Sequence, residues 1–229
     1  VPALFWGMGG SNYLLTKKCV SENRPWYFSD MPYYGRWMGE HTADTCYWRI
    51  IYNSIHINRL LSVPNDRATK MNLVAREWNT GDHILVCPSS PTMSRWCLGI
   101  SDKQWIDKTV TELRKFTDRP IRVREKPRNS KTSGPLAATV SIEDDIKNAH
   151  AVVTSISLSA VDAVLSGVPV FCDRLSSASS VGISDLSKIE TPKYSDNVQQ
   201  WLNTLAYCQF TKDELASGLA KELLSYQSL

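Results

Sequence analysis

Apolar and polar residues follow one another along the chain in blocks that predict strands and helices in turn. Short apolar runs bounded by turn residues predict strands at residues 2–6, 26–28, 47–52, 83–87, 120–124, 151–154 and 168–171. Amphipathic stretches predict helices at residues 13–22, 102–116, 157–165, 196–207 and 211–224, with a further short acidic helix beginning at residue 141. Strand, helix and strand in succession form the unit from which open α/β sheets are built.

The strand–helix alternation predicts the fold class and its division into lobes. Parallel strands joined by crossover helices are expected, most clearly from residue 82 onward. Turn residues at 64–66 and 79–82 predict a boundary near residue 80. We therefore expect an α/β protein with two Rossmann-like lobes, a small N-terminal lobe at 1–80 and a larger C-terminal lobe at 81–229 that includes the closing helices.

Composition and charge narrow the classes of protein that this chain can represent. Its 229 residues carry a formal net charge of +3, a small excess that permits anionic partners without requiring them. The sequence has no apolar run of about 18 residues, so we expect no membrane span. The six cysteines are scattered, without a C-x-x-C pair or a Cys/His cluster, which predicts no metal site and a reducing, cytoplasmic location.

A serine-rich turn follows the apolar run that ends at Thr154. Ser155, Ser157 and Ser159 lie between this predicted strand and the next predicted helix. Free backbone N–H groups and the positive end of the helix dipole favour a phosphate at such a position, and the hydroxyl groups add hydrogen-bond donors. Alternatively, one serine caps the helix and the other two line a turn.

The segment from residue 154 to residue 170 resembles a known pattern. A strand, a Ser/Thr-rich turn, a helix with an acidic residue and a Gly-x-Pro-Val ending are similar to the donor-binding half of GT-B glycosyltransferases, especially capsule-type Kdo transferases. The resemblance implies a nucleotide-sugar co-substrate (a UDP-, GDP- or CMP-sugar), an acceptor-side lobe at 1–80 and a donor lobe at 81–229. These enzymes often carry Glu where this chain has the shorter Asp162, which is alternatively a solvated or capping carboxylate.

The same resemblance implies a basic element beside the donor phosphates. The matching stretch here contains Arg122, Arg124 and Lys126 followed by a proline, but it lacks the histidine of the family. Alternate residues of a strand share a face, so Arg122 and Arg124 are expected to hold a pyrophosphate together. The alternative is a solvated, charged edge strand.

A glycine-rich loop follows the first predicted strand. Gly9 and Gly10 permit a tight turn and a close approach of a ligand. The third glycine of a dinucleotide fingerprint is displaced, so NAD, with Asp30 as its acidic residue, is the lesser alternative. Beyond the nucleotide-sugar co-substrate, we expect no cofactor.

Sugar transfer by inversion needs a general base, and the first lobe offers acidic and histidine side chains for it. Of Asp30, His41, Asp44 and His56, we select Asp30 and His56 as catalytic residues. Asp30 is alternatively a turn cap and His56 a structural histidine. The loop after Asp30, which includes Arg36, is expected to overhang a cleft, and Tyr33, Tyr34 and Trp37 are expected to contact the acceptor.

These observations predict a glycosyltransferase that moves a sugar from a nucleotide-sugar to a hydroxyl group. The basic stretch and the aromatic residues favour a hydroxymethylated base in bacteriophage DNA as the acceptor, and a surface polysaccharide is the second choice. A non-catalytic protein of GT-B-like fold that binds a nucleotide or a phosphate is the competing class. The pattern fits inverting and retaining transfer alike, and it specifies no oligomeric state.

Overall fold

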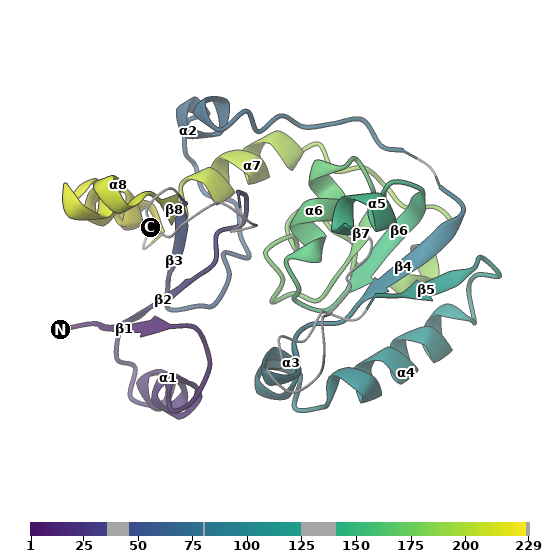
Figure 1. Cartoon of the computed structure of the whole chain (residues 1–229), viewed down its shortest axis with the longest axis horizontal. Helices are drawn as coiled ribbons and strands as arrows, with labels where there is room; N and C mark the ends of the chain where they lie inside the picture. The colour runs from purple at the N-terminus through teal and green to yellow at the C-terminus, as the bar shows by residue number, and fades with distance from the viewer. Residues whose placement is uncertain (36–45, 80, 125–140, 228–229) are drawn as a thin grey trace. The chain divides into compact units, whose positions relative to one another are not determined.

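The computed structural model describes residues 1–35, 46–79, 81–124 and 141–227. The chain divides into two compact units (Figure 1). The first unit contains Val1–Val74 together with Asn197–Leu229, and the second contains Ala75–Asp196. The closing helices were predicted to belong to the second lobe, but they are part of the first unit.

The second unit is built on a four-stranded sheet in the order β5-β4-β6-β7, with every pair parallel (Figure 1). The strands are β4 (His83–Cys87), β5 (Ile121–Val123), β6 (Ala149–Thr154) and β7 (Val170–Phe171). This arrangement confirms the parallel sheet with crossover helices that the sequence predicts for this part of the chain.

Helices cover both faces of this sheet (Figure 1). They are α3 (Pro91–Leu98), α4 (Asp102–Leu113), α5 (Ile142–Ile146) and α6 (Ser159–Leu165), with the 3₁₀ turn η1 (Leu186–Lys188). Ser101 and Gln104 form a capping box that fixes the start of α4. Gly167 follows α6 with a φ of 73°, a conformation that favours glycine, and it turns the chain into β7.

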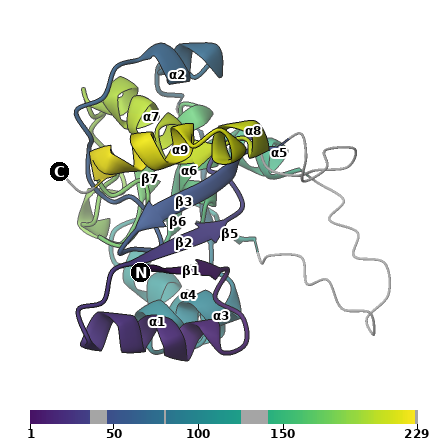
Figure 2. The ribbon, with the colours of Figure 1, turned by 90° about the vertical axis from the view of Figure 1, so that its left-hand side faces the viewer.

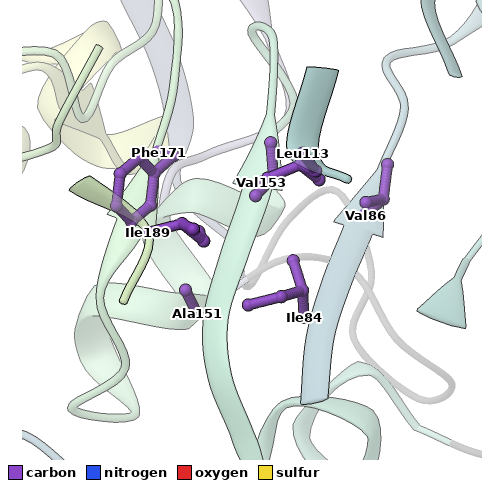
Figure 3. Packing of buried hydrophobic residues seen from close by; sticks show 7 residues of the cluster. All are labelled: Ile84, Val86, Leu113, Ala151, Val153, Phe171 and Ile189. Carbon is purple, nitrogen blue, oxygen red and sulfur yellow. The ribbon is translucent and has the colours of Figure 1, made fainter. Parts of the chain in front are cut away.

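The core of the second unit follows from the two-residue period of its strands (Figure 3). Ile84 and Val86 of β4, together with Ala151 and Val153 of β6, pack against Leu113 of α4, and all five are almost completely buried. Successive side chains of a strand alternate between faces, so the intervening residues face α5 and α6 instead. The sheet is therefore buried on both faces, which fits its nearly continuous apolar strands.

The first unit has a mixed sheet in the order β1-β2-β3-β8. Figure 2 shows β1, β2 and β3 of this sheet side by side. Its strands are β1 (Ala3–Trp6), β2 (Trp26–Asp30), β3 (Trp48–Tyr52) and β8 (Gln209–Phe210). Only β1 and β2 are parallel, whereas β3 is antiparallel to both β2 and β8. The prediction of a parallel sheet is wrong here. Parallel pairing needs a crossover, and the Tyr- and Gly-rich sequence between β2 and β3 lacks the repeat of a crossover helix.

The pairing of β8 with β3 explains why the end of the chain belongs to the first unit. The helices of this unit are α1 (Asn12–Ser21), α2 (Asp66–Lys70), α7 (Val198–Ala206), α8 (Lys212–Ala216) and α9 (Leu219–Leu223), followed by η2 (Leu224–Gln227). The buried guanidinium of Arg67 donates hydrogen bonds to the carbonyl oxygens of Ala206 and Gln209 and pairs with Glu214. One side chain thus joins α2 to the segment from α7 to α8.

Candidate functional site at the carboxyl edge of the parallel sheet

The winding of the second sheet reverses between β4 and β6. The chain goes from β4 to β5 on one side, and β6 then pairs with β4 on the other side. In open α/β sheets, ligands bind outside the carboxyl ends of strands at such a reversal. Here the residues at that position are Pro88–Ser90 after β4 and the serine-rich turn after β6, where the sequence predicts a phosphate.

Hydrogen bonds hold these two turns together. The hydroxyl oxygens of Ser89 and Ser155 lie 2.7 Å apart, and the backbone N–H of Ile156 donates to Ser89 Oγ at 3.2 Å. The carbonyl oxygen of Ser155 accepts from the backbone N–H of Asp173, which follows β7. The side chain of Ser155 is only 1% exposed and braces the turn from inside. A direct bond from this hydroxyl to a phosphate stays a prediction.

The other two predicted serines differ in exposure. Ser159 is buried at the start of α6, whereas Ser157 is partly exposed and its hydroxyl oxygen accepts from the backbone N–H of Ser159 at 3.4 Å. Burial raises the pKa of the Cys87 thiol to about 12, and a hydrogen bond with Ser159 opposes that rise. Of the three serines, Ser157 is therefore the one whose side chain reaches solvent beside the turn.

Charged side chains surround the end of β4. The backbone N–H of Arg124 donates to the carbonyl oxygen of Val86 at 2.9 Å, and its guanidinium pairs with Asp145 of α5. Burial and the hydrogen bond with Ser159 have the largest effects on the pKa of Cys87. Next in size are the charge of Arg124, which lowers this pKa, and the charge of Asp162, which raises it. Arg124 and the half-buried Asp162 therefore both lie near this edge of the sheet.

Arg122 occupies a different place from Arg124. Its side chain is exposed on the edge strand β5. A hydrogen bond with His83 lowers the pKa of Asp82, and Arg122 adds to the lowering, which places it near the amino end of β4. The two arginines thus have different acidic neighbours, although the sequence predicts that they act together. Lys126 lies outside the described residues.

The structure links the two residues predicted to be catalytic in the first unit. Asp30 ends β2, and its Oδ2 atom lies 3.6 Å from Nη2 of Arg49, a buried residue of β3. The Nη1 atom of the same guanidinium lies 3.1 Å from Nδ1 of His56, which is 4% exposed. The sequence does not single out Arg49, because an arginine inside an aromatic strand carries no local sign that it is buried.

The aromatic loop after β2 differs from the prediction. Tyr33 is completely buried, its hydroxyl oxygen accepts from the backbone N–H of Ile57 at 2.9 Å, and burial raises its pKa above the usual range. The expectation that Tyr33 contacts an acceptor from an exposed loop is therefore wrong. Tyr34 is 39% exposed. The backbone N–H groups of Tyr33 and Tyr34 both donate to Gln209 Oε1. Arg36 and Trp37 lie outside the described residues.

The glycine loop forms the turn between β1 and α1. Gly9 and Gly10 are exposed, and Gly10 has a φ of 57°. A Cβ atom at either position would meet no heavy atom within 4 Å. Conformation at Gly10, and not close packing, therefore accounts for the glycine here, and a contact of this loop with a ligand stays a prediction.

The reversal point makes the second unit an open α/β fold of the doubly wound kind. Two solved structures from Thermosulfurimonas dismutans have a similar fold over nearly the whole chain. One is KpsC, beta Kdo 2,7 transferase, with a TM-score of 0.51 and 13% identity over 98% of this chain and 85% of that one. The other is KpsC, beta Kdo 2,4 transferase, with a TM-score of 0.51 and 11% identity over 96% and 86%.

Comparison of the sequence with known families and proteins identifies no relative of this chain. No family model and no curated protein matches the chain. Within the described residues, no helix is both long enough and apolar enough to cross a bilayer. In that same part of the chain, no group of three or more His, Cys, Asp and Glu side chains is arranged to hold a metal ion.

Proposed function

We propose that the protein is a glycosyltransferase that moves a sugar from a nucleotide-sugar donor to a hydroxyl acceptor. The observation that carries the proposal is the reversal point between β4 and β6, where Arg124 and the partly exposed Ser157 lie beside the predicted phosphate turn. The likeness of fold to the two Kdo transferases supports the same class of reaction.

In this proposal, the carboxyl edge of the second unit binds the anionic part of the donor. Backbone N–H groups at the turn after β6 and the guanidinium of Arg124 supply positive potential, and Ser157 supplies a hydroxyl donor. When the bond between sugar and phosphate breaks, negative charge increases on the leaving phosphate. Hydrogen-bond donors of the protein that are fixed in place before the reaction stabilise that charge and so lower the barrier to transfer.

We propose a carbohydrate hydroxyl as the acceptor. The names of both similar structures describe transfer of Kdo, a sugar. The hydroxymethylated DNA base rests on the aromatic residues and on the basic stretch from Arg114 to Lys131, which the structure describes as far as Arg124. Neither that acceptor nor a bacteriophage origin has an observation of its own among the described residues, and the acceptor becomes an outcome of the experiment below.

A panel of UDP-, GDP- and CMP-sugars tests the donor by thermal shift, because a ligand of the native state raises the apparent stability. Arg124→Ala should weaken binding of the active donor about tenfold or more, as expected for a lost hydrogen bond to a charged group. Arg122→Ala is the matched control and should leave it unchanged. Asp145→Asn releases Arg124 from its pair and should leave donor affinity unchanged or increase it.

Turnover then separates the enzyme from the binder. Release of free nucleotide from the bound nucleotide-sugar, faster with an oligosaccharide than with hydroxymethylated DNA, supports the proposal. Faster release with DNA assigns the nucleic acid as acceptor. Tight binding with no release identifies a non-catalytic nucleotide-binding protein, and no binding of any panel member refutes the proposed function.

A further inference from the structure

The chain passes between its two units twice, once between Val74 and Ala75 and once between Asp196 and Asn197. The segments beside these crossings, 73–79 and 192–195, have an irregular backbone. Two short connections therefore join the units, and irregular segments of this kind absorb the backbone rotations of a hinge. The contacts on either side of the crossings determine how far each connection is able to move.

On the side of the first unit, helix α7 holds both connections. The second connection enters α7 at Val198, which is buried. In the same turn, Nε2 of Gln199 donates to the carbonyl oxygen of Leu73 at 3.3 Å, and Leu73 is itself only 3% exposed. One helix thus fixes the last residues of the first connection and the first residues after the second.

On the side of the second unit, Tyr194 joins the two connections. Its hydroxyl group donates to the carbonyl oxygen of Arg76 at 3.1 Å. Its ring packs edge-on against the ring of Trp78, with centroids 5.2 Å apart. Tyr194 belongs to the second connection, whereas Arg76 and Trp78 belong to the first. A single side chain therefore ties one connection to the other beside the crossings.

Each connection has a further anchor on the second unit, farther from the crossing. In the first connection, the backbone N–H of Asn79 donates to the carbonyl oxygen of Gly167 at 2.7 Å. In the second, the carboxylate of Glu190 accepts from the hydroxyl group of Thr117 and pairs with Arg119. These anchors do not involve Tyr194, so the second unit keeps hold of both connections when the tie is lost.

The tie sets how much of each connection is able to move. Without the contacts of Tyr194, residues 76–78 of the first connection and 192–194 of the second gain freedom up to these anchors. A longer flexible segment lets its ends move over a wider range. Tyr194 therefore limits the motion of both connections at once.

We infer that the two connections form one paired hinge between the units, and that Tyr194 couples its two halves. Two pivots held at a fixed spacing define a single axis of rotation, whereas two unlinked connections permit rotation about several axes. The tie consists of one hydrogen bond and one ring contact on a side chain that is 41% exposed, so it limits motion without locking the units. The inference concerns motion and does not rest on the proposed function.

Single-molecule energy transfer between a dye at Leu14 of α1 and a dye at Lys108 of α4 measures the range of distances between the units. Both positions are exposed, and unnatural amino acids carry the dyes because five of the six cysteines are buried. Tyr194→Ala removes the tie, and Tyr194→Phe removes only its hydrogen bond. Tyr226→Ala is the matched control, because Tyr226 is 37% exposed and packs edge-on against Tyr207 within the first unit.

Tyr194→Ala should widen the distribution of distances by about 1.5-fold or more, because the extension of a flexible chain grows with the square root of its length. Tyr194→Phe should lie between Tyr194→Ala and wild type, and Tyr226→Ala should match wild type. Circular dichroism establishes that each variant is folded. If Tyr194→Ala does not fold, Tyr194→Phe and Trp78→Leu decide, since each removes one of the two contacts and should widen the distribution.

A distribution as narrow as that of wild type in the folded Tyr194 variants overturns the inference. An equal widening in Tyr226→Ala overturns it as well, because the effect would then not depend on the connections. No ligand enters the measurement, so its outcome is independent of whether the protein binds a nucleotide-sugar.

Discussion

Ser89 and Ser155 approach each other across the carboxyl ends of β4 and β6, with hydroxyl oxygens 2.7 Å apart in a buried position. Substituting either serine by Ala leaves the other hydroxyl with one partner fewer, so each variant should lose about 1–2 kcal/mol of unfolding free energy. Because the two residues share one bond, the double variant should lose less than the sum of the single losses. Urea denaturation of the four proteins measures the coupling.

Ser157→Ala is the control for that cycle. The residue is partly exposed and its hydroxyl makes only a long contact within the turn. Its unfolding free energy should stay within about 0.5 kcal/mol of wild type, as for most surface substitutions. A loss from Ser157→Ala as large as that from Ser155→Ala would contradict the division into a bracing serine and an accessible one.

Arg67 and Glu214 form the ion pair that we expect to contribute most to the stability of the first unit. Arg67 donates to both carboxylate oxygens, at 2.7 and 2.9 Å, and the two side chains are 10% and 14% exposed. Glu214→Gln keeps the capping box with Thr211 but removes the charge, so it should cost about 3 kcal/mol. Glu112→Gln breaks the exposed pair with Lys115 and should cost less than about 0.5 kcal/mol.

The same pair predicts how stability depends on pH. Burial raises the pKa of Glu214, but the hydrogen bonds and charge of Arg67 outweigh it, and the net pKa lies below the usual 4.5. A depressed folded-state pKa contributes stability that is complete above about pH 4.5 and is lost as the pH falls through the folded value. The stability gap between wild type and Glu214→Gln should therefore narrow below about pH 4.5. If the difference in stability between wild type and Glu214→Gln does not change with pH, the lowered pKa of Glu214 is contradicted.

Gly167 and Gly99 both have positive φ, at 73° and 69°, but their surroundings differ. A Cβ atom at Gly167 would lie 2.3 Å from the carbonyl oxygen of Glu77, whereas one at Gly99 would meet nothing within 4 Å. Gly99→Ala should thus cost only the conformational term, about 1 kcal/mol. Gly167→Ala should cost clearly more, about 2 kcal/mol or above, because the backbone must move. Thermal or urea unfolding compares them, and equal losses would contradict this difference.

The sequence predicts the second unit well because local signals agree there with tertiary structure. The strand predicted at 83–87 is β4 as observed, Ser101 caps α4, and Gly167 follows α6. Each of these features depends on neighbouring residues, which a single sequence displays. The short helix α3 was not predicted, although Ser90 caps it and Pro91 begins it, because eight residues make only about two helical turns.

The first unit and much of the candidate site depend on contacts between distant residues. β8 has only two residues and is a strand because it pairs with β3, so no local pattern reveals it. The burial of Tyr33 depends on hydrogen bonds that its backbone and side chain make with Gln209 and Ile57. In the second unit, likewise, the sequence offers Ser155 as a phosphate ligand, and only the position of Ser89 reveals the bracing bond.

Arg49 contacts both Asp30 and His56, and we expect these two residues to have different roles. Asp30 is 38% exposed at the end of its strand, whereas His56 is buried against the same guanidinium. A general base must reach the acceptor, so we expect Asp30 to be the base and His56 to position Arg49. Asp30→Asn should then lower kcat by about a hundredfold or more with donor affinity unchanged. His56→Ala should instead lower the unfolding free energy by about 2 kcal/mol.

Asp213→Asn provides the comparison for Asp30→Asn, because Asp213 is an exposed acid at the start of α8 in the same unit. Its kcat and its unfolding free energy should match those of wild type. Steady-state kinetics with the active donor, combined with urea unfolding of all three variants, separates the two roles. If Asp30→Asn loses stability but retains kcat, Asp30 caps its turn through the bond from the backbone N–H of Met31, and the base lies elsewhere.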